Sequence, residues 1–140
     1  MKYLLKKIIC LGFVVGLLLA SCGDRLHTIP HTKVNFTVSI NTNKLIHSGG
    51  YEYFTGGING VFVYRLDMST FLAYDRACPY DWEDNGYVIY NQATLQLVCE
   101  ACGSTFNILD GSPMNNSKAN NFLRPYNTRL IDDMTLHVYN

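Results

Sequence analysis

The sequence is poor in charge and in helical periodicity. Charged residues make up 16% of its 140 residues, whereas about 25% is usual for a soluble domain. It contains no Walker-type glycine loop, no Ser/His/Asp pattern and no pair of carboxylates at a recognisable spacing. The sequence therefore contains no motif for nucleotide hydrolysis, acyl transfer or glycoside hydrolysis. We therefore expect one domain without substrate chemistry of its own.

The chain opens with a basic start and an apolar run. Three lysines lie within residues 1–7, and residues 8–20 carry no charge. The run is shorter than the ~20 residues that span a bilayer, and its length is typical of the apolar part of a secretory signal. It ends in Leu19-Ala20-Ser21-Cys22, which resembles the lipobox of bacterial lipoproteins. We predict a signal peptide over residues 1–21 and a lipid anchor, palmitate included, on Cys22.

Removal of this signal changes the charge of the chain. Residues 22–140 carry eight Lys and Arg against eleven Asp and Glu, a net charge of −3. A mildly acidic domain has no electrostatic reason to bind nucleic acid. We expect a polar tether over residues 22–33, a domain over residues 34–140, and an extracytoplasmic location on a membrane of the cell envelope. The expected partners are the membrane, through Cys22, and a redox or envelope protein.

The rest of the chain alternates apolar and polar residues with the period of a β-strand. No segment holds an apolar helical stripe for three turns, and the 10 Tyr and 7 Phe suit pleated surfaces. Residues 49–57 predict turns around a short strand rather than a phosphate-binding loop. We predict an all-β sandwich or barrel of about eight to ten short strands. The clearest predicted strands are residues 34–40, 61–66, 70–74, 87–90, 94–98, 106–109, 130–131 and 134–139.

Three cysteines follow predicted strands in two loops. One loop begins Cys78-Pro79-Tyr80, and the other reads Cys99-Glu100-Ala101-Cys102-Gly103-Ser104. Two such loops form a clamp that can hold a small metal centre between their tips. The hydroxyl of Ser104 can hydrogen-bond to a sulfur and so tune the centre.

This pattern resembles the Rieske iron–sulfur domains, whose hallmark is Cys-x-His in one loop and Cys-x-x-His-Gly-Ser-x-Phe/Tyr in the other. The resemblance covers about residues 60–140, and it implies an antiparallel Rieske-like sandwich or barrel with a two-loop cluster-binding subdomain. It also implies electron transfer through a [2Fe–2S] cluster. The matching residues are Cys78, Cys99, Gly103, Ser104 and Phe106, followed more loosely by Asp110-Gly111 and Arg124-Pro125-Tyr126.

The departures from the family pattern fall on its ligands. Tyr80 stands at the first histidine position and Cys102 at the second. Ser117-Lys118-Ala119 stands near the family's third loop, which usually carries Gly-Pro-Ala. Because neutral imidazoles set the potential of a Rieske centre, a thiolate in their place would lower it. An ordinary Rieske centre is therefore not expected.

Three chemistries remain open for Cys78, Cys99 and Cys102. The first is an atypical [2Fe–2S] site, with Tyr80 or Asp81 as the fourth ligand. The second is zinc on the same thiols. The third is no metal at all, with a disulfide from Cys78 to Cys99 or Cys102, or between the latter two. An export signal without an Arg-Arg pair implies threading of the unfolded chain into an oxidising compartment. We therefore favour the disulfide-tied binding or structural module.

Overall fold

A computed structural model describes residues 29–41 and 44–140. Within these ranges the chain is all-β, with one short 3-10 turn, η1, over Trp82–Asp84, and without an α-helix. None of the described residues forms a helix long and apolar enough to cross a membrane. The nine strands in these ranges are β1 (Asn35–Ser39), β2 (Tyr51–Phe54), β3 (Val61–Arg65), β4 (Phe71–Asp75), β5 (Val88–Asn91), β6 (Gln96–Cys99), β7 (Thr105–Asn107), β8 (Pro125–Asp132) and β9 (Thr135–Tyr139).

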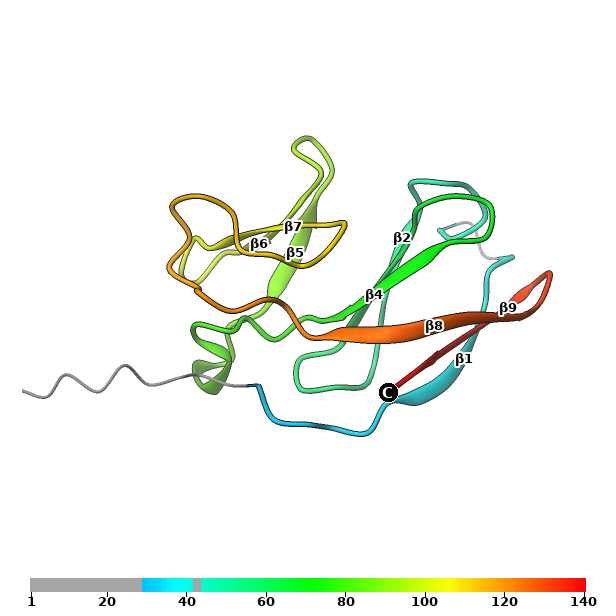
Figure 1. Cartoon of the computed structure of the whole chain (residues 1–140), viewed down its shortest axis with the longest axis horizontal. Helices are drawn as coiled ribbons and strands as arrows, with labels where there is room; N and C mark the ends of the chain where they lie inside the picture. The colour runs from blue at the N-terminus through cyan, green and yellow to red at the C-terminus, as the bar shows by residue number, and fades with distance from the viewer. Residues whose placement is uncertain (1–28, 42–43) are drawn as a thin grey trace, which may run out of the picture.

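The strands form two antiparallel sheets. The larger has the order β1-β9-β8-β4-β3-β2, and the smaller has the order β5-β6-β7. In Figure 1 the smaller sheet lies beside the larger one, as an excursion between β4 and β8. The chain leaves and re-enters the larger sheet at neighbouring points, because Tyr74 at the end of β4 pairs with Pro125 at the start of β8. This arrangement confirms the predicted all-β antiparallel fold with a separate subdomain.

Strand β3 separates two apolar cores. Val61 and Val63 belong to the core of the larger sheet, while Phe62 belongs to the core that the smaller sheet covers. Because successive side chains of a strand point to opposite faces, β3 is buried on both sides. This is why its sequence is nearly continuously apolar. The second core also contains Cys78 and Cys99, so the cysteine loops grow directly out of packed structure.

A group of aromatic rings joins the two sheets. The Phe62 ring lies 6.0 Å from the Tyr51 ring and 5.6 Å from the Tyr90 ring of β5. The Tyr53 hydroxyl accepts a hydrogen bond of 2.9 Å from the backbone N–H of Tyr90. Aromatic pairs of this kind add to the stabilisation that burial provides. The rings therefore hold the smaller sheet, and with it the cysteine loops, in a defined position.

The Asp75 carboxylate ties several segments together at the end of β4. It is fully buried and accepts hydrogen bonds from the Ile58 and Asn59 N–H groups at 2.8 and 3.3 Å. It also accepts one of 2.8 Å from the Ala77 N–H and one of 2.7 Å from the Tyr126 hydroxyl. Ala77 immediately precedes Cys78, so this carboxylate fixes the root of the first cysteine loop.

The predicted strands lie close to the observed ones, except in the last hairpin. The last hairpin is longer than predicted, because β8 begins at Pro125 rather than near Leu130. Its first half alternates polar and apolar residues too weakly to be recognised without its partner β9. The end of the predicted tether also packs against the domain: Ile29 is buried, and its carbonyl accepts a hydrogen bond from Arg124.

Candidate metal centre

The first cysteine loop turns tightly around the carbonyl of Cys78. The N–H groups of Asp81 and Trp82 donate to this carbonyl at 3.2 and 2.9 Å, and the Cys78 N–H donates to the Gly86 carbonyl at 3.0 Å. The short turn η1 follows, and Asn85 ends it in the left-handed conformation with φ 61°. The loop thereby folds back over itself and carries the Asp81 side chain to the cysteines.

Gly86 leaves the space that the Asp81 carboxylate occupies. A Cβ atom at position 86 would lie 2.0 Å from Asp81 Oδ1 and 2.8 Å from the Asp81 carbonyl oxygen. Real Cβ atoms do not approach other atoms this closely. The glycine at this position therefore permits the inward orientation of the carboxylate.

The second cysteine loop is a tight turn after β6. The Gly103 N–H donates to the Cys99 carbonyl at 2.8 Å, and the Cys99 N–H donates to the Ser104 carbonyl at 2.9 Å. Gly103 has φ +78°, a conformation that side chains with a Cβ rarely adopt. The turn places Cys102 beside Cys99 and opposite the first loop.

The two loops bring three sulfurs and one carboxylate together. The ligand atoms of Cys78, Asp81, Cys99 and Cys102 all lie within 4.8 Å of one another. Cys78 Sγ lies 3.6 Å from Cys102 Sγ, and Cys99 Sγ lies 3.4 and 3.6 Å from the two Asp81 carboxylate oxygens. The cysteines that the sequence analysis selected therefore share one compact group, with Asp81 as the fourth member.

Ser104 links this group to the third loop. Its buried hydroxyl oxygen accepts hydrogen bonds of 3.1 and 3.0 Å from the N–H groups of Lys118 and Ala119. The same oxygen lies 3.1 Å from Cys102 Sγ. These two N–H groups use both lone pairs of the hydroxyl oxygen. The hydroxyl proton remains, and it can be donated to the sulfur once Cys102 is a thiolate. Ser104 therefore connects Cys102 to the backbone of residues 118 and 119.

Burial holds the deeper thiols in their neutral form. It raises the pKa of Cys99 from 9.0 to about 11. Burial, followed by a hydrogen bond with Asp81, raises the pKa of Cys78 still further. A cation in contact with the sulfurs would oppose this effect, since a coordinated thiol is deprotonated. Without a cation, both thiols stay protonated at neutral pH.

Tyr80 lies outside the compact group, although it shares the first loop. Its side chain is 44% exposed, and the Lys118 ammonium lies 5.9 Å from the centre of its ring. Of the two fourth ligands that the sequence left open, Asp81 is the one whose oxygen lies beside a sulfur.

The disulfide that the sequence analysis favoured is not formed between the described cysteines. Cys78, Cys99 and Cys102 are all free thiols. The sulfurs of Cys78 and Cys102 lie 3.6 Å apart, which is farther than the disulfide bond length of about 2.05 Å.

Replacement of Gly86 by alanine is expected to weaken metal binding while leaving the three sulfurs in place. The added methyl group must displace the Asp81 carboxylate. Changes in groups that orient ligands typically cost about 10–100-fold in metal affinity, and we expect a loss in that range for zinc in a chelator competition. Gly49→Ala is the control for general destabilisation, since its φ of +87° strains a residue with a Cβ although it lies outside both cysteine loops. Unchanged zinc affinity in Gly86→Ala would show that the carboxylate is not a ligand.

Comparison with known proteins bears on the fold. No protein-family model and no curated protein matches the sequence. The structure resembles the ferredoxin of carbazole 1,9a-dioxygenase from Nocardioides aromaticivorans IC177, with a TM-score of 0.52, 18% identity, and coverage of 77% of this chain and 97% of that chain. A putative NADH-dependent nitrite reductase small subunit from Mycobacterium tuberculosis has a TM-score of 0.47, 17% identity, and coverage of 79% and 97%. The likeness to the ferredoxin agrees with the Rieske-like fold class, and the Cys/Asp group offers four candidate metal ligands.

Proposed function

We propose that this protein is a metal-binding Rieske-like domain whose two cysteine loops hold one thiophilic divalent cation, with zinc as the preferred ion. Its ligands are the sulfurs of Cys78, Cys99 and Cys102 and a carboxylate oxygen of Asp81. The observation that carries this proposal is the compactness of the group, with all four ligand atoms within 4.8 Å of one another. The ion would clamp the two loops to each other.

Two of the separations within the group match edges of one coordination tetrahedron. Zinc lies about 2.3 Å from sulfur and about 2.0–2.2 Å from a carboxylate oxygen, so tetrahedral edges are about 3.8 Å between sulfurs and about 3.5 Å between sulfur and oxygen. The observed separations are 3.6 Å between Cys78 and Cys102, and 3.4 and 3.6 Å between Cys99 and the Asp81 oxygens. Thiolates with one harder ligand suit zinc in a closed structural site.

The second candidate is electron transfer through a [2Fe–2S] cluster with the same ligands, and the likeness to a ferredoxin fold favours it. In such a cluster two ligands bind one iron and two bind the other. Ligands on different irons are then separated by the length of the cluster as well as by their own bonds. The compact group therefore supports a single ion better than it supports a cluster.

Elemental analysis of the purified protein separates these candidates. We expect one zinc per chain, no visible absorption, and a lower melting temperature after removal of zinc by a chelator. Cobalt in place of zinc should produce sulfur-to-cobalt charge-transfer absorption. Two irons with acid-labile sulfide and a brown colour would replace the zinc proposal with the cluster. A metal-free protein with one thiol titrating out of three would overturn both.

Zinc affinity is expected to rise steeply with pH. The folded protein keeps Cys78 and Cys99 protonated because their pKa values are raised, and both must lose their protons to bind the ion. Release of at least two protons implies a rise of about 100-fold in affinity per pH unit below these pKa values. Competition titrations at pH 6, 7 and 8, corrected for protonation of the competing chelator, measure this slope. A pH-independent affinity would contradict thiolate ligation.

We also propose that a lipid on Cys22 anchors the protein on the outer side of a membrane, where it meets a redox or envelope protein. The support is the sequence pattern of residues 1–22, which lies outside the described residues. Cys22→Ala is expected to move the protein from the membrane fraction to the soluble fraction. Retention of the variant in the membrane fraction would contradict the lipid anchor.

A further inference from the structure

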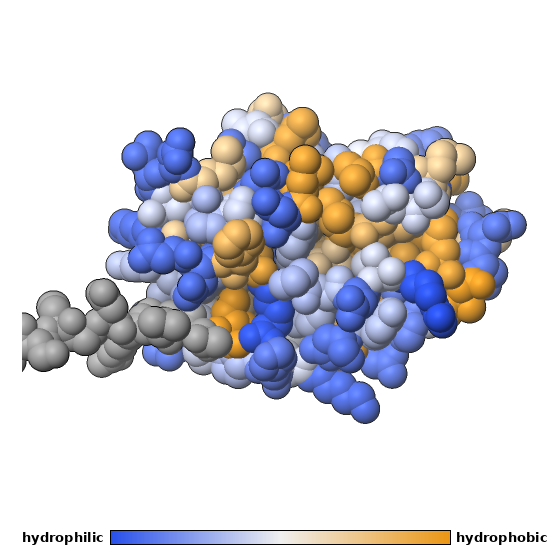
Figure 2. Space-filling view, in the orientation of Figure 1, coloured by the Kyte–Doolittle hydropathy of each residue, from blue (hydrophilic) through white to orange (hydrophobic). Residues whose placement is uncertain are grey.

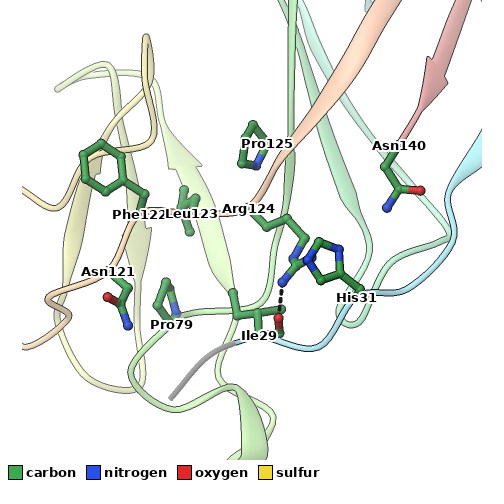
Figure 3. A pocket seen from close by; sticks show the side chains of 9 residues that line it. All are labelled: Ile29, His31, Pro79, Asn121, Phe122, Leu123, Arg124, Pro125 and Asn140. Carbon is green, nitrogen blue, oxygen red and sulfur yellow. Dashed lines mark hydrogen bonds between the residues drawn. The ribbon is translucent and has the colours of Figure 1, made fainter. Parts of the chain in front are cut away.

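An open pocket of about 460 Å³ lies next to the first cysteine loop. Figure 3 shows how it is assembled from segments far apart in the sequence: the beginning of the described chain, the residue after Cys78, and the segment that leads into β8. The residues that matter for its chemistry are Ile29, His31, Pro79, Phe122, Leu123 and Arg124. Its volume lies within the range of about 300–1,000 Å³ that is usual for small-molecule sites.

Arg124 brings a partly unsatisfied cation to this pocket. One end of its guanidinium group donates to the Ile29 carbonyl (Figure 3). Its Nε atom is buried and has no hydrogen-bond partner among the described residues. A buried donor without an acceptor costs free energy, so the protein does not satisfy the whole guanidinium group, and Arg124 lines the pocket.

The charge around Arg124 favours an anion. Among the described residues that line the pocket, none is Asp or Glu, and His31 is the second basic side chain. An arginine guanidinium binds a planar carboxylate through parallel, charge-assisted hydrogen bonds. The pocket therefore selects for negative charge, although the domain as a whole is mildly acidic.

The remaining walls favour an apolar body on the ligand. Leu123 and Ile29 are buried beneath the pocket, and the Phe122 ring is 59% exposed at its edge. Figure 2 shows an apolar area bounded by hydrophilic residues close to the beginning of the described chain. Asn140, which also lines the pocket, is already engaged, because its side chain donates to the Thr32 carbonyl at 2.7 Å and accepts from the Val34 N–H at 3.0 Å. It therefore supports one wall and leaves Arg124 to provide the specific contact.

We propose that this pocket is a binding site for a small organic carboxylate with a flat apolar body. Arg124 binds the carboxylate, and the exposed side chains of Phe122 and Pro125 contact the apolar part. None of the four candidate metal ligands lines the pocket, so the proposal does not depend on which metal the cysteines hold.

Calorimetric titration of the full-length protein with benzoate tests the site, with benzamide and acetate as matched probes. Benzoate should bind, whereas benzamide lacks the charge and acetate lacks the apolar body. Each should bind at least about tenfold more weakly than benzoate, as expected for the loss of one charge-assisted contact or of the ring's burial. Absence of benzoate binding, or equal binding of benzamide, would overturn the proposal.

Three variants assign the binding to this pocket. Arg124→Gln should weaken benzoate binding at least about tenfold, and Phe122→Ala should weaken it without affecting the buried core, because this ring is largely exposed. Arg129→Gln, an exposed arginine of β8 outside the pocket, should bind as the unmodified protein does. Equal binding by Arg124→Gln and the unmodified protein would place benzoate elsewhere. Titration of both zinc-loaded and chelator-treated protein keeps this result separate from the metal proposal.

Discussion

Replacement of Cys99 by serine is expected to lower zinc affinity by about 100-fold or more. Structural zinc sites bind with about 10–16 kcal/mol, so one of four ligands accounts for roughly 3 kcal/mol or more, and about 1.4 kcal/mol corresponds to tenfold in affinity. A neutral hydroxyl is a much weaker zinc ligand than a thiolate. Chelator competition measures the loss, and thermal unfolding with and without zinc measures its effect on stability.

The local structure makes serine at this position a fair test of ligation rather than of folding. Cys99 is fully buried, and its thiol lies 3.4 Å from an Asp81 oxygen. A serine hydroxyl fits the same space and can donate to the same carboxylate. The chelator-treated variant should therefore melt close to the chelator-treated unmodified protein, while the zinc-dependent rise in melting temperature should be lost. The pH dependence of the remaining affinity should also fall by one proton. A Cys99→Ser protein that retains full zinc affinity would exclude Cys99 as a ligand.

The positions of the cysteine loops could be predicted because strand periodicity and cysteine spacing are local signals. Val34, Val38 and Ile40 alternate toward one face, Cys78 comes shortly after β4, and Cys99 ends β6. The turn glycine and the serine hydroxyl are also local signals, because Gly103 and Ser104 directly follow Cys102 in the sequence. The site could therefore be found without the structure.

The fourth ligand could not be chosen from the sequence. Tyr80 and Asp81 are adjacent, and which side chain turns inward depends on how the loop closes. That closure rests on the left-handed conformation of Asn85 and on the space left by Gly86. The sequence analysis singled out candidate metal ligands, and Asn85 and Gly86 were not among them. A glycine five residues after a loop aspartate was the only signal, and it is a weak one.

The pocket and the buried carboxylate were missed because they depend on contacts between distant segments. Arg124 meets Ile29 across 95 residues, and Tyr126 meets Asp75 across 51. Asp75 ends an apolar strand, where an acidic residue ordinarily marks a solvent-exposed turn. Only the fold shows that this one is buried.

Replacement of Asp75 by alanine is expected to destabilise the protein by roughly 3–5 kcal/mol, because it leaves several buried hydrogen-bond donors without an acceptor. The fully buried carboxylate accepts four hydrogen bonds, and each buried donor left without an acceptor costs about 1–3 kcal/mol. Domains of this size are stable by only about 5–15 kcal/mol. Chemical denaturation of the chelator-treated protein measures the change directly.

Conservative variants distinguish the hydrogen-bond network from simple loss of volume. Asp75→Asn keeps the shape but turns an amide N–H₂ toward existing donors, so it should also be strongly destabilising. Tyr126→Phe removes one hydrogen bond and should cost less, about 1–2 kcal/mol. Asp110→Asn is the matched control, because this exposed carboxylate accepts only from Ser112 and a surface change of this kind usually costs within about 0.5 kcal/mol. A loss below about 1 kcal/mol in Asp75→Asn would show that the network contributes little.

The same carboxylate connects stability to the metal centre. Asp75 accepts from the Ala77 N–H, one residue before Cys78, so its loss frees the root of the first cysteine loop. If zinc is the ion, as proposed, it binds the folded state and should restore part of the lost stability by mass action. The restoration should be smaller in Asp75→Asn than in Tyr126→Phe at the same zinc concentration, because only the former changes the position of a ligand. Equal restoration would mean that the loop holds its shape through its own turn at Cys78, Asp81 and Gly86, and that Asp75 serves the larger core alone.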